Sequence, residues 1–364
     1  MTTVLFMIFI TIVISAISTP LVIKMAVRFG LVDIPKDSRR VHSKPMPRVG
    51  GLAIIISMVI GLAVYYFMTL NATPISQLSL KGSTQFLGYI LGAFFIALMG
   101  IIDDIFTLRA RYKFIFQVLS VVAVYMCGIR IEILDVPFLS KVPLDILSFP
   151  ITGLWVIAIS CAVNLIDGLD GLAAGISSIA SFALLTIFAT TSASIEPIVI
   201  TSVLLGALLG FLPYNFHPAK TFMGDVGSNF IGFTIAVVSI LGFAKGYTVI
   251  AVVIPILALG VPVFDTVFAM VRRAAKGKPL LQPDGGHVHH RLLKRGLNQR
   301  QAVYILYTIS SILCIISVLL VSQRVYKIII LLFAAALFIA LEITNTIKIR
   351  KIKKIENTSN NHLE

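Results

Sequence analysis

Charged residues are scarce in this sequence of 364 residues: they make up 13%, whereas hydrophobic residues make up 58%. This balance indicates a polytopic membrane protein, and no soluble domain interrupts the apolar runs. Cysteine is also rare. Cys127, Cys161 and Cys314 show no metal-type spacing and fall in apolar runs, which excludes a disulfide framework and favours buried thiols. No internal repeat is visible, so the inverted duplication common in transporters is not expected.

The hydrophobic residues gather in runs close to the roughly 20 residues that a membrane-spanning helix needs. We predict an all-α polytopic membrane protein with about eleven transmembrane helices, in which residues 1–347 form one domain and residues 348–364 form a basic and then polar cytoplasmic tail. The predicted helices cover residues 4–23, 51–70, 85–102, 114–131, 149–163, 172–190, 197–213, 226–244, 247–269, 302–321 and 326–345.

Basic residues outnumber acidic ones, 30 to 16, which gives a formal net charge of +14. In a soluble protein this excess would suggest nucleic acid, but 24 of the 30 basic residues fall in inner segments when the N-terminus is outside. The positive-inside bias therefore places the C-terminus in the cytoplasm, and we expect no nucleic-acid partner. On the outer side, the segment 129–150 alternates apolar and polar residues over 130–133 and then turns through Pro137 and Pro143, which predicts a short β-hairpin.

Five of the few acidic residues lie at the ends of predicted spans, and the topology brings all five to the cytoplasmic face. A carboxylate within the membrane costs about 2.5 to 3.5 kcal/mol at a helix centre on insertion scales, so such residues usually mark a functional site. The five are Asp103, Asp104, Asp167, Asp170 and Asp225.

The tandem Asp103 and Asp104 end the third predicted span, and Asp225 begins the eighth. Adjacent carboxylates repel each other unless a cation lies nearby, which favours a divalent ion. Two alternatives stay open: interfacial charges answered by basic residues such as Lys113, and Asp225 as a helix N-cap worth about 1 kcal/mol. Oxygen ligands without a nearby cysteine favour Mg2+, or Mn2+, over zinc.

Asn164, Asp167 and Asp170 follow one another at intervals of three, so a helical turn would place successive pairs on nearly one face. A turn with helix-capping aspartates is the alternative.

Two basic segments complete the inner face. The stretch around His42 and Arg48 is suited to anionic headgroups, with a positive-inside cluster as the alternative. The second segment, with His287, His289, His290 and Arg291, is suited to diphosphate oxygens, with zinc and a solvated loop as alternatives.

Together these residues resemble the polyprenyl-phosphate N-acetylhexosamine-1-phosphate transferase family, also called glycosyltransferase family 4. The resemblance covers nearly the whole chain and rests on five ordered stretches. They are RRVHSKPMPRVGG at 39–51, GIIDDIFTLRARYKFIFQ at 100–117, NLIDGLDGLAAG at 164–175, FMGDVGSNFIGF at 222–233 and GGHVHHRLLKRGLNQRQA at 285–302. The HVHHRL form resembles the branch that uses UDP-N-acetylglucosamine.

The resemblance implies a catalytic domain in a bacterial cytoplasmic membrane that converts UDP-N-acetylglucosamine and undecaprenyl phosphate into undecaprenyl-diphospho-N-acetylglucosamine and UMP. It implies Mg2+ or Mn2+ at Asp225, Asp103 and Asp104, with Asp167 also catalytic. It further implies substrate contacts from Lys113, Asn164, Asp170, His287, His289, His290, Arg291, Arg48 and His42. A homo-oligomer is compatible with the sequence.

Other functions are weighed against this one. Within the family, the donor could instead be another UDP-N-acetylhexosamine or UDP-muramoyl-pentapeptide. An intramembrane prenyltransferase also uses aspartate motifs near span ends, but would leave the HVHHR stretch without a role. A transporter should place its acids near the bilayer midplane, whereas these acids gather at one surface.

Overall fold

The structure is a computed structural model that describes residues 2–33, 46–72, 80–134, 142–191, 193–243, 256–274 and 288–321. Among the predictions, His42, His287, the span 326–345 and the tail 348–364 lie outside these residues. The longer helices are α1 (Thr2–Arg28), α2 (Gly51–Ala72), α3 (Leu80–Phe106), α4 (Ala110–Met126), α5 (Ser148–Ile166), α6 (Leu172–Thr190), α7 (Ile195–Asn215), α8 (Gly224–Phe243), α10 (Gly260–Ala274) and α12 (Gln299–Val321). The short elements are β1 (Val32–Asp33), β2 (Met46–Pro47), β3 (Ile133–Leu134), β4 (Val142–Pro143), a 3-10 turn (Asp145–Leu147) and α11 (Val288–Lys294).

Eight helices within the described part of the chain are long and apolar enough to cross a membrane, namely α1, α2, α3, α5, α6, α7, α8 and α12. Each matches one of the predicted spans. The predicted span 114–131 corresponds to α4, which has 17 residues and ends earlier, at Met126. The predicted span 247–269 overlaps α10, which begins at Gly260, and residues 247–255 of this span lie outside the described residues. The count of eleven spans stays a prediction.

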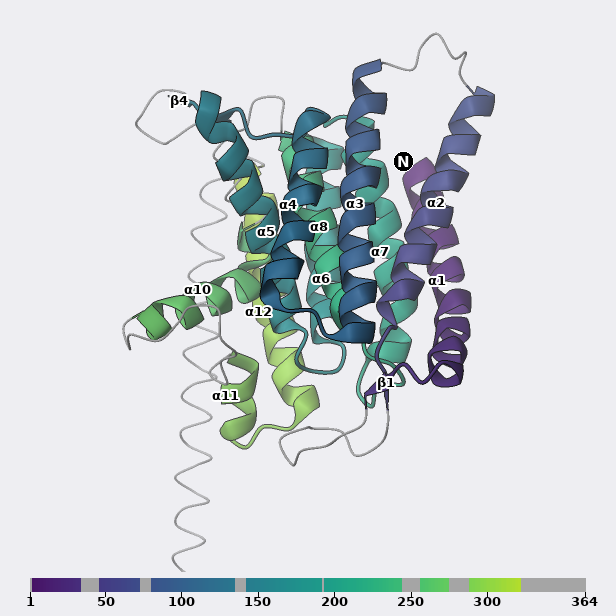
Figure 1. Cartoon of the computed structure of the whole chain (residues 1–364), viewed down its shortest axis with the longest axis vertical. Coiled ribbons are helices and arrows are strands. Elements are labelled where there is room, and N and C mark those ends of the chain that lie inside the picture. Colours follow the sequence, from purple (N-terminus) through teal and green to yellow (C-terminus); the bar gives the residue numbers. More distant parts are fainter. Residues whose placement is uncertain are drawn as a thin grey trace, which may run out of the picture.

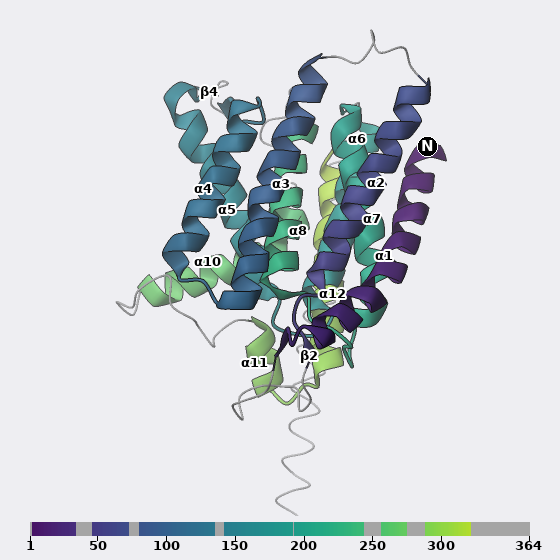
Figure 2. The same ribbon diagram turned by 45° about the vertical axis from the view of Figure 1, so that its right-hand side comes forward.

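The helices form a bundle whose two ends differ (Figure 1). At the lower end in this view lie α11 and the antiparallel pair of β1 and β2. The antiparallel pair of β3 and β4 lies at the upper end. Figure 2 shows from a second direction that α10 runs across the bundle while the long helices run along it. The crosswise direction of α10 differs from the expected ninth span.

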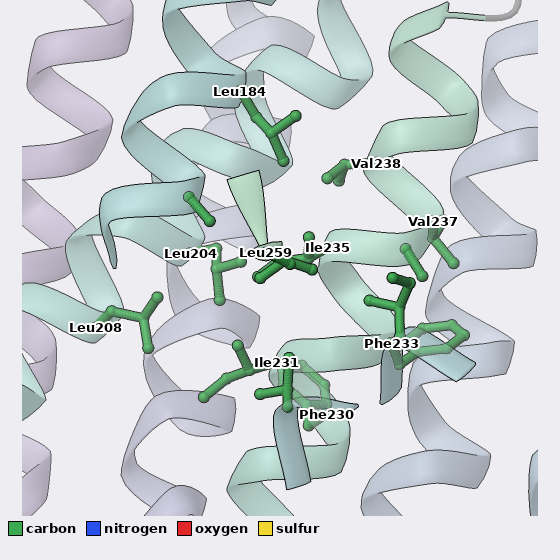
Figure 3. Packing of buried hydrophobic residues seen from close by; sticks show 14 of the residues in the cluster. Leu184, Leu204, Leu208, Phe230, Ile231, Phe233, Ile235, Val237, Val238 and Leu259 are labelled. Atoms are coloured by element: carbon green, nitrogen blue, oxygen red, sulfur yellow. The ribbon is translucent and has the colours of Figure 1, made fainter. Parts of the chain in front are cut away.

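The centre of the bundle is formed by α6, α7 and α8, which are the most buried of the eight candidate spans. Figure 3 shows side chains of α8 packed against those of α6 and α7, among them Ile231, Ile235, Leu184, Leu204 and Leu208. Polar side chains also join helices. Ser160 on α5 donates to the carbonyl of Asn229 on α8 at 2.9 Å. Hydrogen bonds of this kind contribute about 0.6 kcal/mol each in membrane proteins, so apolar packing dominates this contact.

Candidate active site

The C-terminal end of α3 approaches the start of α8 closely because a glycine lies at the contact. A Cβ atom at Gly100 would overlap the backbone of Val226. The contact places Asp103 and Asp104, in the last turn of α3, beside Asp225 in the first turn of α8. One carboxylate oxygen from each of the three acids lies within 4.8 Å of the others. Acids from distant parts of the sequence therefore share one site, which we call the carboxylate cluster.

Lys113, in the first turn of α4, supplies a counter-charge to the carboxylate cluster. Its Nζ donates hydrogen bonds of 2.7 Å to Oδ2 of Asp103 and to Oδ2 of Asp225. The Lys113 side chain is 31% exposed, whereas that of Asp103 is 4% exposed. Arg109 and Arg111 are exposed on the surface. Among the basic residues that follow α3, Lys113 is thus the one that points into the cluster.

Asp103 also shapes the turn that leads to Lys113. Its Oδ1 accepts a hydrogen bond of 2.7 Å from the backbone N–H of Leu108. Thr107, immediately before, has a φ of 51°, a left-handed conformation that is uncommon for residues other than glycine. The carboxylate therefore helps to hold a strained turn that returns the chain toward the cluster.

Asp104 caps α8 from a different helix. Its Oδ1 accepts from the N–H of Asp225 at 3.0 Å, and its Oδ2 accepts from the N–H of Val226 at 3.1 Å. The first N–H groups of a helix have no partner within the helix, and here Asp104 supplies one. The Nε of Arg48 lies 3.4 Å from Oδ1 of Asp104. The capping role considered for Asp225 is thus carried out by Asp104, which leaves the Asp225 carboxylate for the cluster.

Arg48 reaches the site because the chain before α2 is bound to the chain before α8. The N–H of Gly50 donates to the carbonyl of Phe222 at 2.9 Å. The N–H of Gly51 donates to the carbonyl of Met223 at 2.8 Å. These backbone bonds hold the two segments in register, so the basic segment and the acid of α8 meet at the same end of the bundle.

The segment 164–170 lies beside the cluster, although its helical spacing is interrupted. α5 ends at Ile166, so the three-residue periodicity that would align Asn164, Asp167 and Asp170 on one helical face does not continue through the segment. Asn164 still faces α8, and its Nδ2 donates to Oγ of Ser228 at 2.9 Å. The predicted common face is therefore wrong, but the segment adjoins the start of α8.

Asp167 lies in the connection between α5 and α6, and the pKa of its carboxyl group is raised. Desolvation, together with the negative charges of Asp225, Asp104 and Asp170, raises its pKa from 3.8 to about 8. Part of the side chain remains exposed. Near neutral pH this carboxyl group is protonated in the absence of a nearby cation, so it can donate a hydrogen bond.

Asp170 pairs with a residue that the sequence analysis did not single out. Nδ1 of His217 lies 2.8 Å from Oδ2 of Asp170, and the N–H of Ala219 donates to the same oxygen at 3.2 Å. His217 follows α7, in a connection between two apolar helices. The only sequence signal was its place in the short connection that precedes the motif of Asp225.

The histidine segment reaches the same region through α11. His289 is buried, and a Cβ atom at Gly168 would collide with its imidazole ring, so the ring lies on the connection that carries Asp167. The rings of His289 and His290 are 4.3 Å apart, centroid to centroid. Arg291 is exposed in the same helix. Oδ1 of Asp265, on α10, accepts a 2.9 Å hydrogen bond from the N–H of Val288 and fixes the start of α11.

The donor set of the cluster suits a hard divalent cation. Within the described ranges, Asp103, Asp104 and Asp225 are the one group of three or more acidic, histidine or cysteine side chains placed to hold a metal ion. All three offer oxygen, which Mg2+ and Mn2+ prefer. The positive groups of Lys113 and Arg48 lie at the edges of the cluster, where anionic substrate groups would find both a cation and hydrogen-bond donors.

The fold and site define a multi-pass helical membrane protein with an oxygen-rich acidic centre flanked by basic and histidine side chains. The chain belongs to glycosyl transferase family 4, whose model matches residues 86–243, a range that contains all five predicted aspartates. It is 39% identical to a probable undecaprenyl-phosphate N-acetylglucosaminyl 1-phosphate transferase of Bacillus subtilis, over 88% of this chain and 86% of the relative.

Other relatives have related names. A decaprenyl-phosphate N-acetylglucosaminephosphotransferase of Mycolicibacterium smegmatis is 36% identical, over 78% of this chain and 73% of the relative. An undecaprenyl-phosphate alpha-N-acetylglucosaminyl 1-phosphate transferase of Salmonella typhi is 29% identical, over 79% of this chain and 76% of the relative. The relatives thus share transfer of N-acetylglucosamine phosphate to a polyprenyl phosphate, as their names describe it.

Proposed function

We propose that this protein transfers N-acetylglucosamine 1-phosphate from UDP-N-acetylglucosamine to undecaprenyl phosphate and releases UMP. The carboxylate cluster bridged by Lys113, in a chain 39% identical to the Bacillus subtilis relative, carries the proposal. The reaction would be the first membrane step in the synthesis of a cell-envelope glycopolymer such as teichoic acid or O-antigen. Its site would face the cytoplasm from the bacterial inner membrane.

The bond changes require little proton chemistry. An oxygen of the lipid phosphate attacks the β-phosphorus of the sugar nucleotide, the new P–O bond forms, and the bond to the bridging oxygen of UMP breaks. A phosphate monoester has a second pKa of about 6, so the lipid phosphate is largely a dianion near neutral pH. A nucleophile therefore exists without a base, and we favour direct displacement over a route through an aspartyl intermediate.

Asp103, Asp104 and Asp225 are the residues that would hold Mg2+ or Mn2+. When bound, such a cation neutralises the diphosphate and stabilises charge on the departing phosphate. Lys113 contributes a positive charge that can turn from the carboxylates to a phosphate oxygen when substrate enters. Because Asp104 also caps α8, it holds Asp225 in place as well as contributing charge.

The sugar nucleotide would lie along the connection between α5 and α6. A protonated Asp167 does not repel an incoming diphosphate, and it can donate a hydrogen bond to one of its oxygens. Asn164 and Asp170 border the same region. The groups proposed to contact phosphate oxygens are His287, His289, His290, Arg291, Arg48 and His42.

The test is UMP release by the purified protein with undecaprenyl phosphate, Mg2+ and one sugar nucleotide at a time. UDP-N-acetylglucosamine should support turnover, and UDP-N-acetylgalactosamine and UDP-muramoyl-pentapeptide should support much less. Faster turnover with either of the other two sugar nucleotides would identify that nucleotide as the donor instead. No release with any of the three from a folded, monodisperse preparation would remove the transferase assignment.

A further inference from the structure

Two connections that are distant in the sequence are joined at Asp170. One links α5 to α6 and carries Asp167, and the other links α7 to α8 and carries His217. Oδ2 of Asp170 accepts two hydrogen bonds, one from the imidazole Nδ1 of His217 at 2.8 Å and one from the backbone N–H of Ala219 at 3.2 Å. Because a carboxylate oxygen accepts, the imidazole tautomer in this contact carries its proton on Nδ1. The side chains of His217 and Asp170 are 36% and 17% exposed, so the contact is partly shielded from water.

The residue after Asp170 is held by α12. The hydroxyl of Tyr307 donates to the carbonyl of Gly171 at 2.5 Å. Gly171 has a φ of 77°, a left-handed conformation that a residue with a side chain rarely adopts. A Cβ atom at this position would also press against the ring of Phe216, which precedes His217. The connection between α5 and α6 is thus fixed at two consecutive residues, by two different elements.

Fixing these two residues determines the part of the connection that faces the carboxylate cluster. Asp167 lies three residues earlier, between Asp170 and Asn164, and Nδ2 of Asn164 donates to Oγ of Ser228 on α8 at 2.9 Å. Gly168 is in contact with the buried ring of His289. A shift of the connection would therefore move Asp167 relative to the acids and would open the surface on which His289 rests.

We propose, on the basis of the proposed function, that His217 is a positioning residue for the sugar-nucleotide side of the site. Its Nδ1–H holds the Asp170 carboxylate, and this bond sets the connection that presents Asp167 and supports His289. His217 acts through Asp170 and does not contact the reacting atoms. Asp170 accordingly serves the fold of the site first, and the loss of His217 acts through the loss of its bond to Asp170.

The test compares His217→Asn with His217→Leu. An asparagine amide places an N–H donor near the position of Nδ1, whereas leucine removes the donor at similar volume. Loss of a side chain that orients a residue of the site typically costs about 10-fold to 100-fold in activity. We expect His217→Leu to lower kcat/KM for UDP-N-acetylglucosamine by about 30-fold, in that range. Its KM for undecaprenyl phosphate should stay unchanged, and His217→Asn should recover most of the loss.

A double-mutant cycle separates a linked pair from two independent contacts. Asp170→Ala combined with His217→Leu should be no worse than Asp170→Ala alone, because residues that act through one bond are not additive. Additive losses would overturn the proposal, as would equal activity of His217→Leu and the parent protein. Lys220→Gln is the matched control, because Lys220 is exposed in the same connection and should tolerate the change.

A second measurement does not need turnover. Hydrogen exchange of a peptide covering 164–175 should be faster in His217→Leu than in the parent protein and near the parent rate in His217→Asn. Unchanged exchange in His217→Leu would overturn the proposal even if activity fell. If the parent protein releases no UMP with any sugar nucleotide, the proposed function fails, and the exchange result still decides whether His217 positions this connection.

Discussion

Replacing Lys113 with methionine tests the carboxylate cluster without relying on activity. The ammonium donates to two carboxylates at 2.7 Å each, and a third carboxylate lies within the same 4.8 Å group. Methionine keeps an unbranched side chain of similar length but removes the charge. In the presence of a chelator, the three neighbouring acids of the variant have no ammonium group among them. We therefore expect Lys113→Met to unfold more easily than the parent protein.

The size of the effect follows from burial. Removing one partner of a buried ion pair costs about 3 to 5 kcal/mol. Because Lys113 is 31% exposed and Asp225 is 25% exposed, solvent screening reduces this to about 2 kcal/mol. At about 2 to 4 °C per kcal/mol for larger domains, the expected decrease in Tm is about 5 °C in a chelator.

Excess Mg2+ should remove most of this difference. A divalent ion replaces the missing positive charge, and in the variant it does not compete with an ammonium for the carboxylates. Ligand that binds only the folded state stabilises it by mass action, so Mg2+ should raise the Tm of Lys113→Met more than that of the parent. Turnover should stay low, since the ammonium is also proposed to contact phosphate.

The assay is thermal unfolding of the detergent-solubilised protein with chelator and with excess Mg2+. Lys220→Met is the matched control, because it removes one positive charge from an exposed position outside the cluster. Its Tm should respond to Mg2+ as the parent does. An equal Mg2+ response in Lys113→Met and the parent would refute the reasoning, as would a variant that is no less stable in chelator.

Three further predictions concern other carboxylates. Asp225→Asn should abolish turnover and the Mg2+-dependent rise in Tm, and near-normal activity at limiting Mg2+ would contradict this. Asp167→Asn should be more stable than the parent in chelator, by up to about 2 kcal/mol after screening. Because the pKa of Asp167 in the folded protein is raised to about 8, the folded parent protein loses stability as pH rises from about 4 to 8. The Tm difference between Asp167→Asn and the parent should therefore widen over that window. A constant difference would argue against it. Asp265→Leu should raise the KM for the sugar nucleotide about tenfold, because it releases the start of α11. Asp265→Asn keeps an acceptor for the Val288 N–H, so its KM should stay near the parent value. Equal KM values for the two variants would exclude this role.

Hydropathy predicted most of the bundle because the bilayer imposes the same length on every spanning helix. It did less well where local chemistry ends a helix. α4 stops at Met126 because Gly128 takes a φ of 83°, which ends the helical path before the apolar run is over. α10 begins at Gly260, and Pro262 is tolerated there because it lies in the first turn, where the N–H has no helical partner.

The sequence predicted which acidic residues belong to the candidate site, but it did not predict the hydrogen bonds that they form. Rare acids in an apolar sequence are conspicuous, so Asp103, Asp104 and Asp225 could be selected from the sequence. Which groups they bond depends on helix contacts between residues more than 100 positions apart, such as Lys113 with Asp225. His217 was missed for the same reason, since a lone histidine in a short connection gives no sign that its partner is Asp170.

The double use of Asp104 affects how variants at this position should be understood. An inactive Asp104→Ala protein invites the conclusion that a reacting group has been removed. The same change also deprives the opening turn of α8 of its acceptor, and that turn carries Asp225. Loss of turnover at residue 104 therefore reports on architecture and reactivity together, and only a variant that still accepts both amide protons can separate them.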